Sequence, residues 1–311
     1  MYIFSLTPTI DEKPVKKYTG LSLHARIIRK LSLIIPLIIM FLLVFMAIFA
    51  DLSWIGQPDV GLAPQNPNYG IPRDKLLPPS FMEGGKSDYF LGTDRLGRDV
   101  LSRLIHGARV SLSVSLLIIA ITASIGTILG IVAGYRGGRT EDFIMRVVDT
   151  ALSFPGILLA LLLAVSIGPG YWTVVFALSI LGWAGYARLV RGEALRLRDS
   201  DFVAQARTNG ASTLRIMIKH IFPNVVNSLI IIMTLQIGMM ILAESTLSYL
   251  GIGITAPAAS WGSMVADGRV DLDRAWWISA FPGIAIGLVV MSGNFLGDWI
   301  RDKLDPRLRQ L

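Results

Sequence analysis

Six long apolar segments constrain the fold of this chain more than any other feature of its 311 residues. A transmembrane helix needs about 20 predominantly apolar residues, because the hydrocarbon core of a bilayer is about 30 Å thick. The segments span residues 31–50, 110–134, 147–168, 172–190, 225–250 and 276–297. The sequence therefore predicts an all-α integral membrane protein with six transmembrane helices.

Basic residues lie in short clusters between these segments and give the chain a net charge of +7. They occupy the N-terminal tail, the links after the second and fourth segments, and the C-terminal tail. Six spans place all four clusters on one side, and cytoplasmic loops carry the excess of Lys and Arg. Both termini are therefore predicted to be cytoplasmic. Nucleic acid is excluded as a partner, because it is typically bound by a basic patch on one domain.

Residues that commonly carry enzyme chemistry or hold a metal are scarce in this sequence. The chain has no cysteine, and its histidines, His24, His106 and His220, lie far apart in no metal-spacing motif. HExxH and GxSxG motifs are also missing. The sequence therefore predicts no catalytic residue and no metal site.

A basic stretch, FVAQARTNGASTLRIMIKHIFPN at 202–224, separates the fourth and fifth apolar segments. Its second half alternates apolar and basic side chains, as an amphipathic helix would. Such a helix can lie on anionic lipid. An exposed helix with apolar and basic anchors can equally dock in a groove of a soluble partner. The residues alone leave both functions open.

Helix boundaries within this stretch follow from its capping residues. Ser200 or Asp201 is suited to cap a first short helix, and Gly210 provides the left-handed residue that ends one. Ser212 is suited to cap a second. Pro223 predicts a break before the next span. We therefore expect two short helices joined by a hinge at the cytoplasmic membrane surface.

The stretch resembles the EAA loop of ABC importer permeases. That loop reads Glu-Ala-Ala, three residues, Gly, nine residues, then Ile-x-Leu-Pro. This chain keeps both spacings, the glycine and the proline, but has Ala204 in place of the Glu and His220 and Phe222 in place of Ile and Leu. In the family, the loop binds in a cleft of the ATPase subunit. The resemblance assigns coupling to Ala204, Gln205, Ala206, Gly210, Ala211, Ser212, Ile221, Phe222 and Pro223.

Three further stretches extend this resemblance over nearly the whole chain. Residues 90–115, 243–269 and 281–308 look like signature regions of the dipeptide, oligopeptide and nickel permeases. The match is to the second, C-type permease of a heterodimer. It implies the type I importer fold, with a tail, first helix and external loop over 1–105 and a core over 106–311 that contains the loop 201–224.

The resemblance also implies partners and cargo. The family works in the bacterial inner membrane with a second homologous permease, two ABC ATPase subunits that bind the ATP, and an extracytoplasmic binding protein. This chain would then need no cofactor of its own. Di- and oligopeptides are the expected cargo, with nickel, glutathione or another small solute as alternatives. From another class, a proton-coupled carrier or a membrane-embedded enzyme stays open as a rival.

Charged residues precede the second apolar segment, on the predicted outer side: Asp94, Arg95, Arg98 and Asp99. Opposite charges so close in sequence can pair in a mixed-charge cap that leads into the second helix. The same side chains can instead help to receive the binding protein that the family resemblance implies. The sequence leaves both interpretations open.

Glu244 lies inside the fifth apolar segment. An ionisable residue at membrane depth is costly, so it is by default a functional hypothesis. Its neighbours Met240 and Ser248 make this region a possible pathway or gate. The alternative is a structural role, in which Glu244 forms an ion pair or hydrogen bonds near Ser245, Thr246 and Ser248.

Small residues recur at spacing four in the second segment, at Gly126, Gly130 and Gly134, and in the sixth, at Gly283 and Gly287. Such spacing lets helix backbones approach closely within lipid. The partner helix can belong to this chain or to another permease subunit. We expect packing within the chain.

Overall fold

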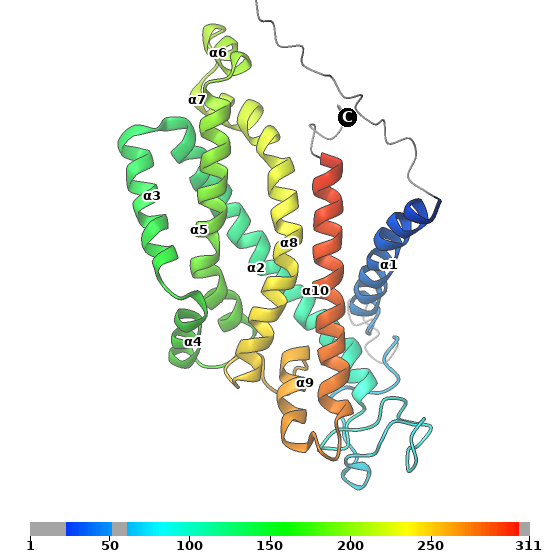
Figure 1. The fold of residues 1–311 in the computed structure, drawn as a ribbon. Helices are drawn as coiled ribbons and strands as arrows, with labels where there is room; N and C mark the ends of the chain where they lie inside the picture. The colour runs from blue at the N-terminus through cyan, green and yellow to red at the C-terminus, as the bar shows by residue number, and fades with distance from the viewer. Residues whose placement is uncertain (1–22, 52–60, 305–311) are drawn as a thin grey trace, which may run out of the picture.

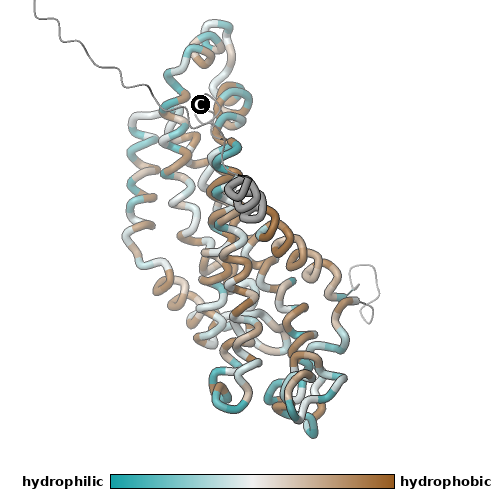
Figure 2. Tube along the Cα trace, turned by 45° about the vertical axis from the view of Figure 1, so that its right-hand side comes forward, coloured by the Kyte–Doolittle hydropathy of each residue, from teal (hydrophilic) through white to brown (hydrophobic). Residues whose placement is uncertain are grey.

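The computed structural model describes residues 23–51 and 61–304, with side chains from residue 34 onward. Every regular element in these ranges is a helix, and they contain no strand, only isolated bridges such as Gly70–Arg98. Figure 1 shows a long helical bundle, with α6 (Asp201–Thr208) at one end and α9 (Trp261–Gly268) at the other. Figure 2 shows apolar residues along the middle of the bundle and polar residues toward both ends. This distribution suits a protein whose middle lies in lipid.

Within residues 23–51 and 61–304, four helical stretches are long and apolar enough to cross a membrane, and the bent pair described below would make a fifth if it is one span. They are α2 (Val100–Arg136), α5 (Tyr171–Arg198), the stretch Thr213–Tyr249 that ends in α8 (Phe222–Tyr249), and α10 (Trp277–Leu304). They correspond to the predicted second, fourth, fifth and sixth segments. The helix predicted first is α1 (Leu23–Ile48), of which Ile34–Ile48 forms a shorter apolar helix. The all-helical membrane fold is confirmed, whereas the count of six spans stays a prediction.

The third apolar segment is not the single helix that we predicted over 147–168. It is split into α3 (Gly138–Ser153) and α4 (Gly156–Ile167), which meet at an angle of 80°. Pro155 has no N–H to donate and disfavours helical dihedrals in the residue before it. Phe154 is accordingly extended, with φ −82° and ψ 137°.

The predicted break at Pro223 is wrong. A helix runs without interruption from α7 (Thr213–Ile216) through the π-helical turn η3 (Met217–Ile221) into α8, 37 residues in all. Pro223 lies in the first turn of α8, immediately after the wide turn, where the Phe222 N–H reaches back to the Met217 carbonyl. Inside a helix, proline lacks the N–H for the i→i−4 hydrogen bond and its ring crowds the carbonyl of residue i−4. The wide π-helical turn directly before Pro223 relieves this crowding, so the helix continues.

Helix α2 packs closely against α5 along the predicted glycine stripe. A Cβ added at Gly126 or Gly130 would lie within 2.7 Å of a backbone carbonyl oxygen of α5, and one at Gly134 within 2.6 Å. The expected packing within the chain is confirmed for these three residues. Open space surrounds Gly283 and Gly287 on α10 instead.

Two short 3-10 helices lie outside the bundle in the described residues. They are η2 (Pro72–Asp74) in the segment 61–99 and η4 (Arg269–Asp271) after α9. Figure 1 places that segment beside α9, at the end of the bundle opposite α6. The basic tails at residues 1–22 and 305–311, which carry the prediction about the termini, lie outside the described residues.

Candidate functional site: the coupling loop and the external face

The coupling loop, residues 201–224, projects from one end of the bundle (Figure 1). Its first helix, α6, ends in a Schellman motif. The Ala211 N–H donates to the Ala206 carbonyl (3.0 Å) and the Gly210 N–H to the Arg207 carbonyl (2.9 Å). Gly210 has a φ of +77°, which glycine adopts without steric cost. The predicted helix end at Gly210 is therefore confirmed.

The two predicted N-caps of the coupling loop differ. Ser212 caps α7, because its hydroxyl accepts from the Arg215 N–H at 3.4 Å. Ser200 occupies the cap position of α6, but its hydroxyl donates back to the Leu197 carbonyl and accepts no helix N–H. Asp201 is the first residue of α6 and supplies an acidic side chain to its first turn.

An aromatic contact attaches α6 to the bundle. The Arg207 guanidinium lies over the Tyr135 ring at the end of α2, with its carbon 5.2 Å from the ring centroid. The Arg207 Nε also donates to the Tyr135 hydroxyl (3.3 Å). The side chain of Val203, which belongs to α6, is fully buried in the apolar cluster that α6 forms with α2 and α5. These contacts fix α6 on α2 and α5, and the sequence reasoning did not find the Tyr135 partner.

The predicted coupling residues divide by exposure. Ala206 and Ile221 are buried in the bundle, and Ala211 is half-buried. Those left exposed on the loop surface are Ala204, Gln205, Gly210, Ser212, Phe222 and Pro223. The apolar face predicted for the second helix is divided too, since Ile216 is buried whereas Leu214 and Ile218 are 62% and 56% exposed. The loop thus presents apolar and basic side chains outward.

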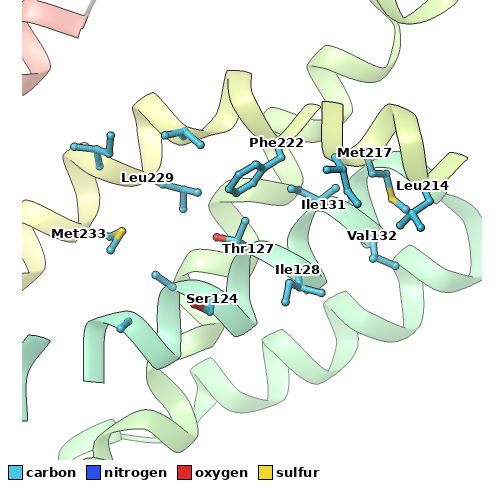
Figure 3. A pocket seen from close by; sticks show the side chains of 15 residues that line it. Ser124, Thr127, Ile128, Ile131, Val132, Leu214, Met217, Phe222, Leu229 and Met233 are labelled. Atoms are coloured by element: carbon cyan, nitrogen blue, oxygen red, sulfur yellow. The ribbon is translucent and has the colours of Figure 1, made fainter. Parts of the chain in front are cut away.

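An apolar groove of about 710 Å³ runs between α2 and the helix that begins in the coupling loop (Figure 3). From α2 it takes Ser124, Thr127 and Ile131, and from the other side Met217, Phe222 and Met233. The residues it shares with the coupling loop are Leu214, Met217, Ile218 and Phe222. A change in the position of the loop therefore changes the wall of the groove. No local sequence signal predicts this groove, because it forms between two helices that are far apart in the chain.

Charged residues at the other end of the bundle pair with one another and with α9. The buried Arg98 contacts Asp94 (Nε to Oδ2, 2.6 Å), and Arg103 lies 3.6 Å from the same oxygen. Both guanidinium groups also reach Asp267 on α9, at 3.4 Å each. Arg95, which is half exposed, pairs with Asp271 (2.9 Å). We call Asp94, Arg95, Arg98 and Asp267 the external face.

Asp99 begins α2 as its N-cap. Its Oδ2 accepts from the Ser102 N–H (2.8 Å) and from the Ser102 hydroxyl (2.6 Å). Its Oδ1 is buried without a hydrogen-bond partner, and burial raises the pKa of the Asp99 carboxyl. Asp99 is therefore held in a structural position, and like Asp94 and Arg98 it is buried. The docking role of these residues stays a prediction.

The structure buries two of the three predicted pathway residues and brings none of them to the groove. Glu244 and Ser248 are buried among α2, α8 and the chain leading into α9, and Met240 is half-buried in an apolar cluster. The pathway role of these residues stays a prediction. Across residues 34–51 and 61–304, no group of three or more His, Asp or Glu side chains is placed to hold a metal ion.

Comparison with known proteins places these features in a family. The family model described as "Binding-protein-dependent transport system inner membrane component" matches residues 126–310, which include the coupling loop. The di/tripeptide transport system permease protein of Pseudomonas aeruginosa is 40% identical over 273 residues, covering 88% of this chain and 87% of that protein.

Two Bacillus subtilis proteins are similar over comparable lengths. Its dipeptide transport system permease protein is 44% identical over 238 residues, covering 76% of this chain and 72% of that protein. Its oligopeptide transport system permease protein is 38% identical over 280 residues, covering 89% and 86%. These relatives are transport permeases and not enzymes, as the sequence predicts for this chain. This chain therefore belongs to the family of inner membrane components of binding-protein-dependent transport systems.

Proposed function

We propose that this chain forms half of the membrane pathway of an ATP-driven importer for di- and oligopeptides. A second, homologous permease completes the pathway, two ABC ATPase subunits bind the coupling loop, and an external binding protein delivers the peptide. The names of the relatives support the cargo. In this proposal the coupling loop and both termini face the cytoplasm, and the external face lies outside.

One observation carries the proposal. From Thr213 onward, the coupling loop is the beginning of the same continuous helix, Thr213–Tyr249, that walls the groove and reaches the opposite end of the bundle. At about 1.5 Å per residue, 37 helical residues extend about 55 Å, enough to cross a bilayer. A displacement of the loop by a closing ATPase is thereby delivered to the membrane interior without an intervening hinge.

The mechanism needs no covalent chemistry in this chain. Closure of the ATP-bound ATPases moves the exposed surface of α6 and α7, and the movement passes along α8. The groove residues on α8 shift against Thr127 and Ile131 of α2, and the bundle changes from inward- to outward-facing. ATP hydrolysis in the partner subunits resets it. ATP thus drives peptide transport by changing how α8 packs against α2.

The test is uptake of a radiolabelled dipeptide by cells that depend on this permease. We expect vanadate, which traps ABC ATPases, to abolish uptake, and a proton uncoupler applied at constant ATP to leave it intact. Unlabelled dipeptides and oligopeptides should compete, whereas nickel and glutathione should not. Purification of the tagged chain in mild detergent should recover ABC ATPases and a second permease.

Two results would overturn the proposal in different ways. Uptake that resists vanadate and is abolished by the uncoupler would establish a proton-coupled carrier. Vanadate-sensitive uptake in which only nickel or glutathione competes would support an ATP-driven importer but would contradict the peptide cargo.

A further inference from the structure

Glu244 lies in the outer part of α8 and is fully buried. Its carboxylate is surrounded by serine hydroxyls. Ser248 donates to Oε1 (2.7 Å), and Ser111 of α2 and Ser245 donate to Oε2 (3.3 and 3.4 Å). A buried carboxylate is costly unless such donors satisfy it. The Ser111 hydrogen bond joins α8 to α2, whereas Ser245 and Ser248 belong to α8 itself.

The same hydroxyls accept backbone N–H groups from the chain that leads into α9. The Ile254 N–H donates to the Ser248 hydroxyl (3.0 Å) and the Trp261 N–H to the Ser111 hydroxyl (3.1 Å). A hydroxyl that accepts an N–H turns its own hydrogen toward the next acceptor. Each chain of hydrogen bonds thus runs from a backbone N–H, through a serine, to Glu244.

A third chain of the same kind starts at the capping box of α9. The Ser263 N–H donates to the Ser260 hydroxyl (3.2 Å), which in turn donates to Ser248 (3.4 Å). We call Glu244 with Ser111, Ser245, Ser248 and Ser260 the Glu244 network. Three backbone amides of the segment 254–263 are therefore linked through serine hydroxyls to one carboxylate.

Close packing accompanies the network. A Cβ on Gly262 would lie 2.4 Å from the Ser245 Cα, and one on Gly107 would lie 2.9 Å from the indole ring of Trp261. That ring is fully buried, and its Nε1 donates to the Leu104 carbonyl (3.0 Å). The start of α9 is thus held directly on α2 and α8. Asp267, near the end of α9 and itself part of the external face, then contacts Arg98 of that face and the buried Arg103 of α2.

We propose that Glu244 is the positioning residue that makes the external face move together with α8. This inference rests on the proposed function. The continuous helix then connects two partners: at Thr213 it begins in the coupling loop, and near its other end the Glu244 network attaches it to α9. The partner at the external face is the peptide-loaded binding protein. Its arrival would be transmitted to the ATPases through α9, Glu244 and α8, and closure of the ATPases would be transmitted outward by the same contacts.

The experiment uses the reconstituted complex of both permeases and the ATPases, with the binding protein and a dipeptide. The variants are Glu244→Gln and Ser248→Ala. Glu244→Gln keeps the shape of the side chain but replaces one acceptor oxygen by an NH2 group, which faces the serine hydroxyl hydrogens. Ser248→Ala removes the 2.7 Å donor to Glu244. Thr246→Ala is the control on α8, since its hydroxyl bonds only to Leu242 of its own helix. Glu193→Gln is the control for loss of a carboxylate, because Glu193 of α5 contacts Arg196 and Ser228 away from α9.

ATPase activity is measured with and without the loaded binding protein, and hydrogen exchange is measured over 250–264 and 201–212. We expect Glu244→Gln and Ser248→Ala to lower the ratio of stimulated to basal ATPase activity about fivefold or more, the range of a typical coupling between sites. Basal activity and recovery of the ATPases should stay unchanged. Exchange should rise in 250–264 alone, and both controls should behave as wild type.

Stimulation that survives both variants, with unchanged exchange at 250–264, would overturn the inference. A parallel fall of basal and stimulated activity would also overturn it, since that indicates general loss of structure. A changed peptide KM with normal stimulation would place Glu244 in the pathway wall. If the wild-type chain recovers no ATPase, the proposed function fails, and that failure is visible before any variant is made.

Discussion

The Arg207 guanidinium lies over the Tyr135 ring, 5.2 Å from its centroid, and joins the coupling loop to the end of α2. A cation–π contact is worth about 0.5–1 kcal/mol at an exposed site. We expect Arg207→Ala to weaken binding of the ATPases about two- to fivefold by releasing α6, measured as affinity in detergent. Tyr135→Phe keeps the ring and loses only the hydroxyl bond, so it should bind nearly as wild type. Equal losses in both variants would show that the hydroxyl, and not the ring, holds α6.

Gly210 is constrained by its backbone and not by its surroundings, because a Cβ there would meet open space. Its positive φ costs an ordinary residue about 1–2 kcal/mol. Gly210→Val should therefore reduce recovery of the ATPases with the tagged chain, whereas Gly210→Asn should retain most of it, since Asn tolerates this conformation. Gly192→Ala on α5, where a Cβ also meets open space, is the control. If Asn and Val are equally harmful, side-chain size at the ATPase surface decides instead.

At Gly130, α2 and α5 are in direct contact and leave no room for a side chain. An added Cβ would lie 2.7 Å from both the Ala187 oxygen and the Val190 Cβ. Gly130→Ala should lower the thermal stability of the purified chain, because overpacking costs about 1–3 kcal/mol. Gly283→Ala on α10 should not, because no described residue outside its own helix lies within 4 Å of the added Cβ. A stable Gly130→Ala variant would mean that α2 and α5 separate readily.

Asp94 accepts the Leu96 and Arg98 N–H groups with one carboxylate oxygen and faces the two buried arginines with the other. Removing one partner from a buried ion pair costs about 3–5 kcal/mol. Asp94→Leu should therefore unfold at a clearly lower temperature than wild type.

Arg95→Ala is the matched comparison on the external face, because surface ion pairs contribute only about 0–1 kcal/mol. This variant should fold normally and weaken binding of the loaded binding protein, more so at low salt, where exposed charges are screened least. Normal affinity at low salt would remove Arg95 from the docking surface.

Hydropathy was sufficient for the four long helices, and the capping residues for the helix end at Gly210 and the N-cap at Ser212, because these signals are local in sequence. The Glu244 network could not be predicted in this way. Ser111 is 133 residues from Glu244, and the Trp261 N–H that completes its hydrogen bonding is 150 residues from Ser111. Only the packing of α2 against α8 and α9 brings them together. Tyr135 and Arg207, 72 residues apart, are a second example.

Proline shows the limit of local signals most directly. The tripeptide Phe-Pro-Gly occurs at 154–156 and again at 281–283. The first copy divides α3 from α4 at 80°, whereas the second lies inside the continuous helix α10, where Pro282 is buried. A third Phe-Pro step, at Pro223, follows a π-helical turn and interrupts nothing. Tertiary packing decides which proline bends a helix, so the prediction failed at Pro155 and at Pro223 in opposite directions.

The bend at Pro155 also restricts where annular lipid can touch this chain. The last carbonyls of α3 and the first amides of α4 lack helical partners, and the residues from Ser153 to Leu158 are exposed. The Ser153 hydroxyl satisfies one carbonyl, that of Thr150. Hydrocarbon chains offer no hydrogen bonds, so irregular backbone at membrane depth is stable only against protein or water. In the proposed topology, which puts residues 147–168 within the bilayer, lipid tails are then excluded from this bend, and a neighbouring subunit or a hydrated cavity occupies it.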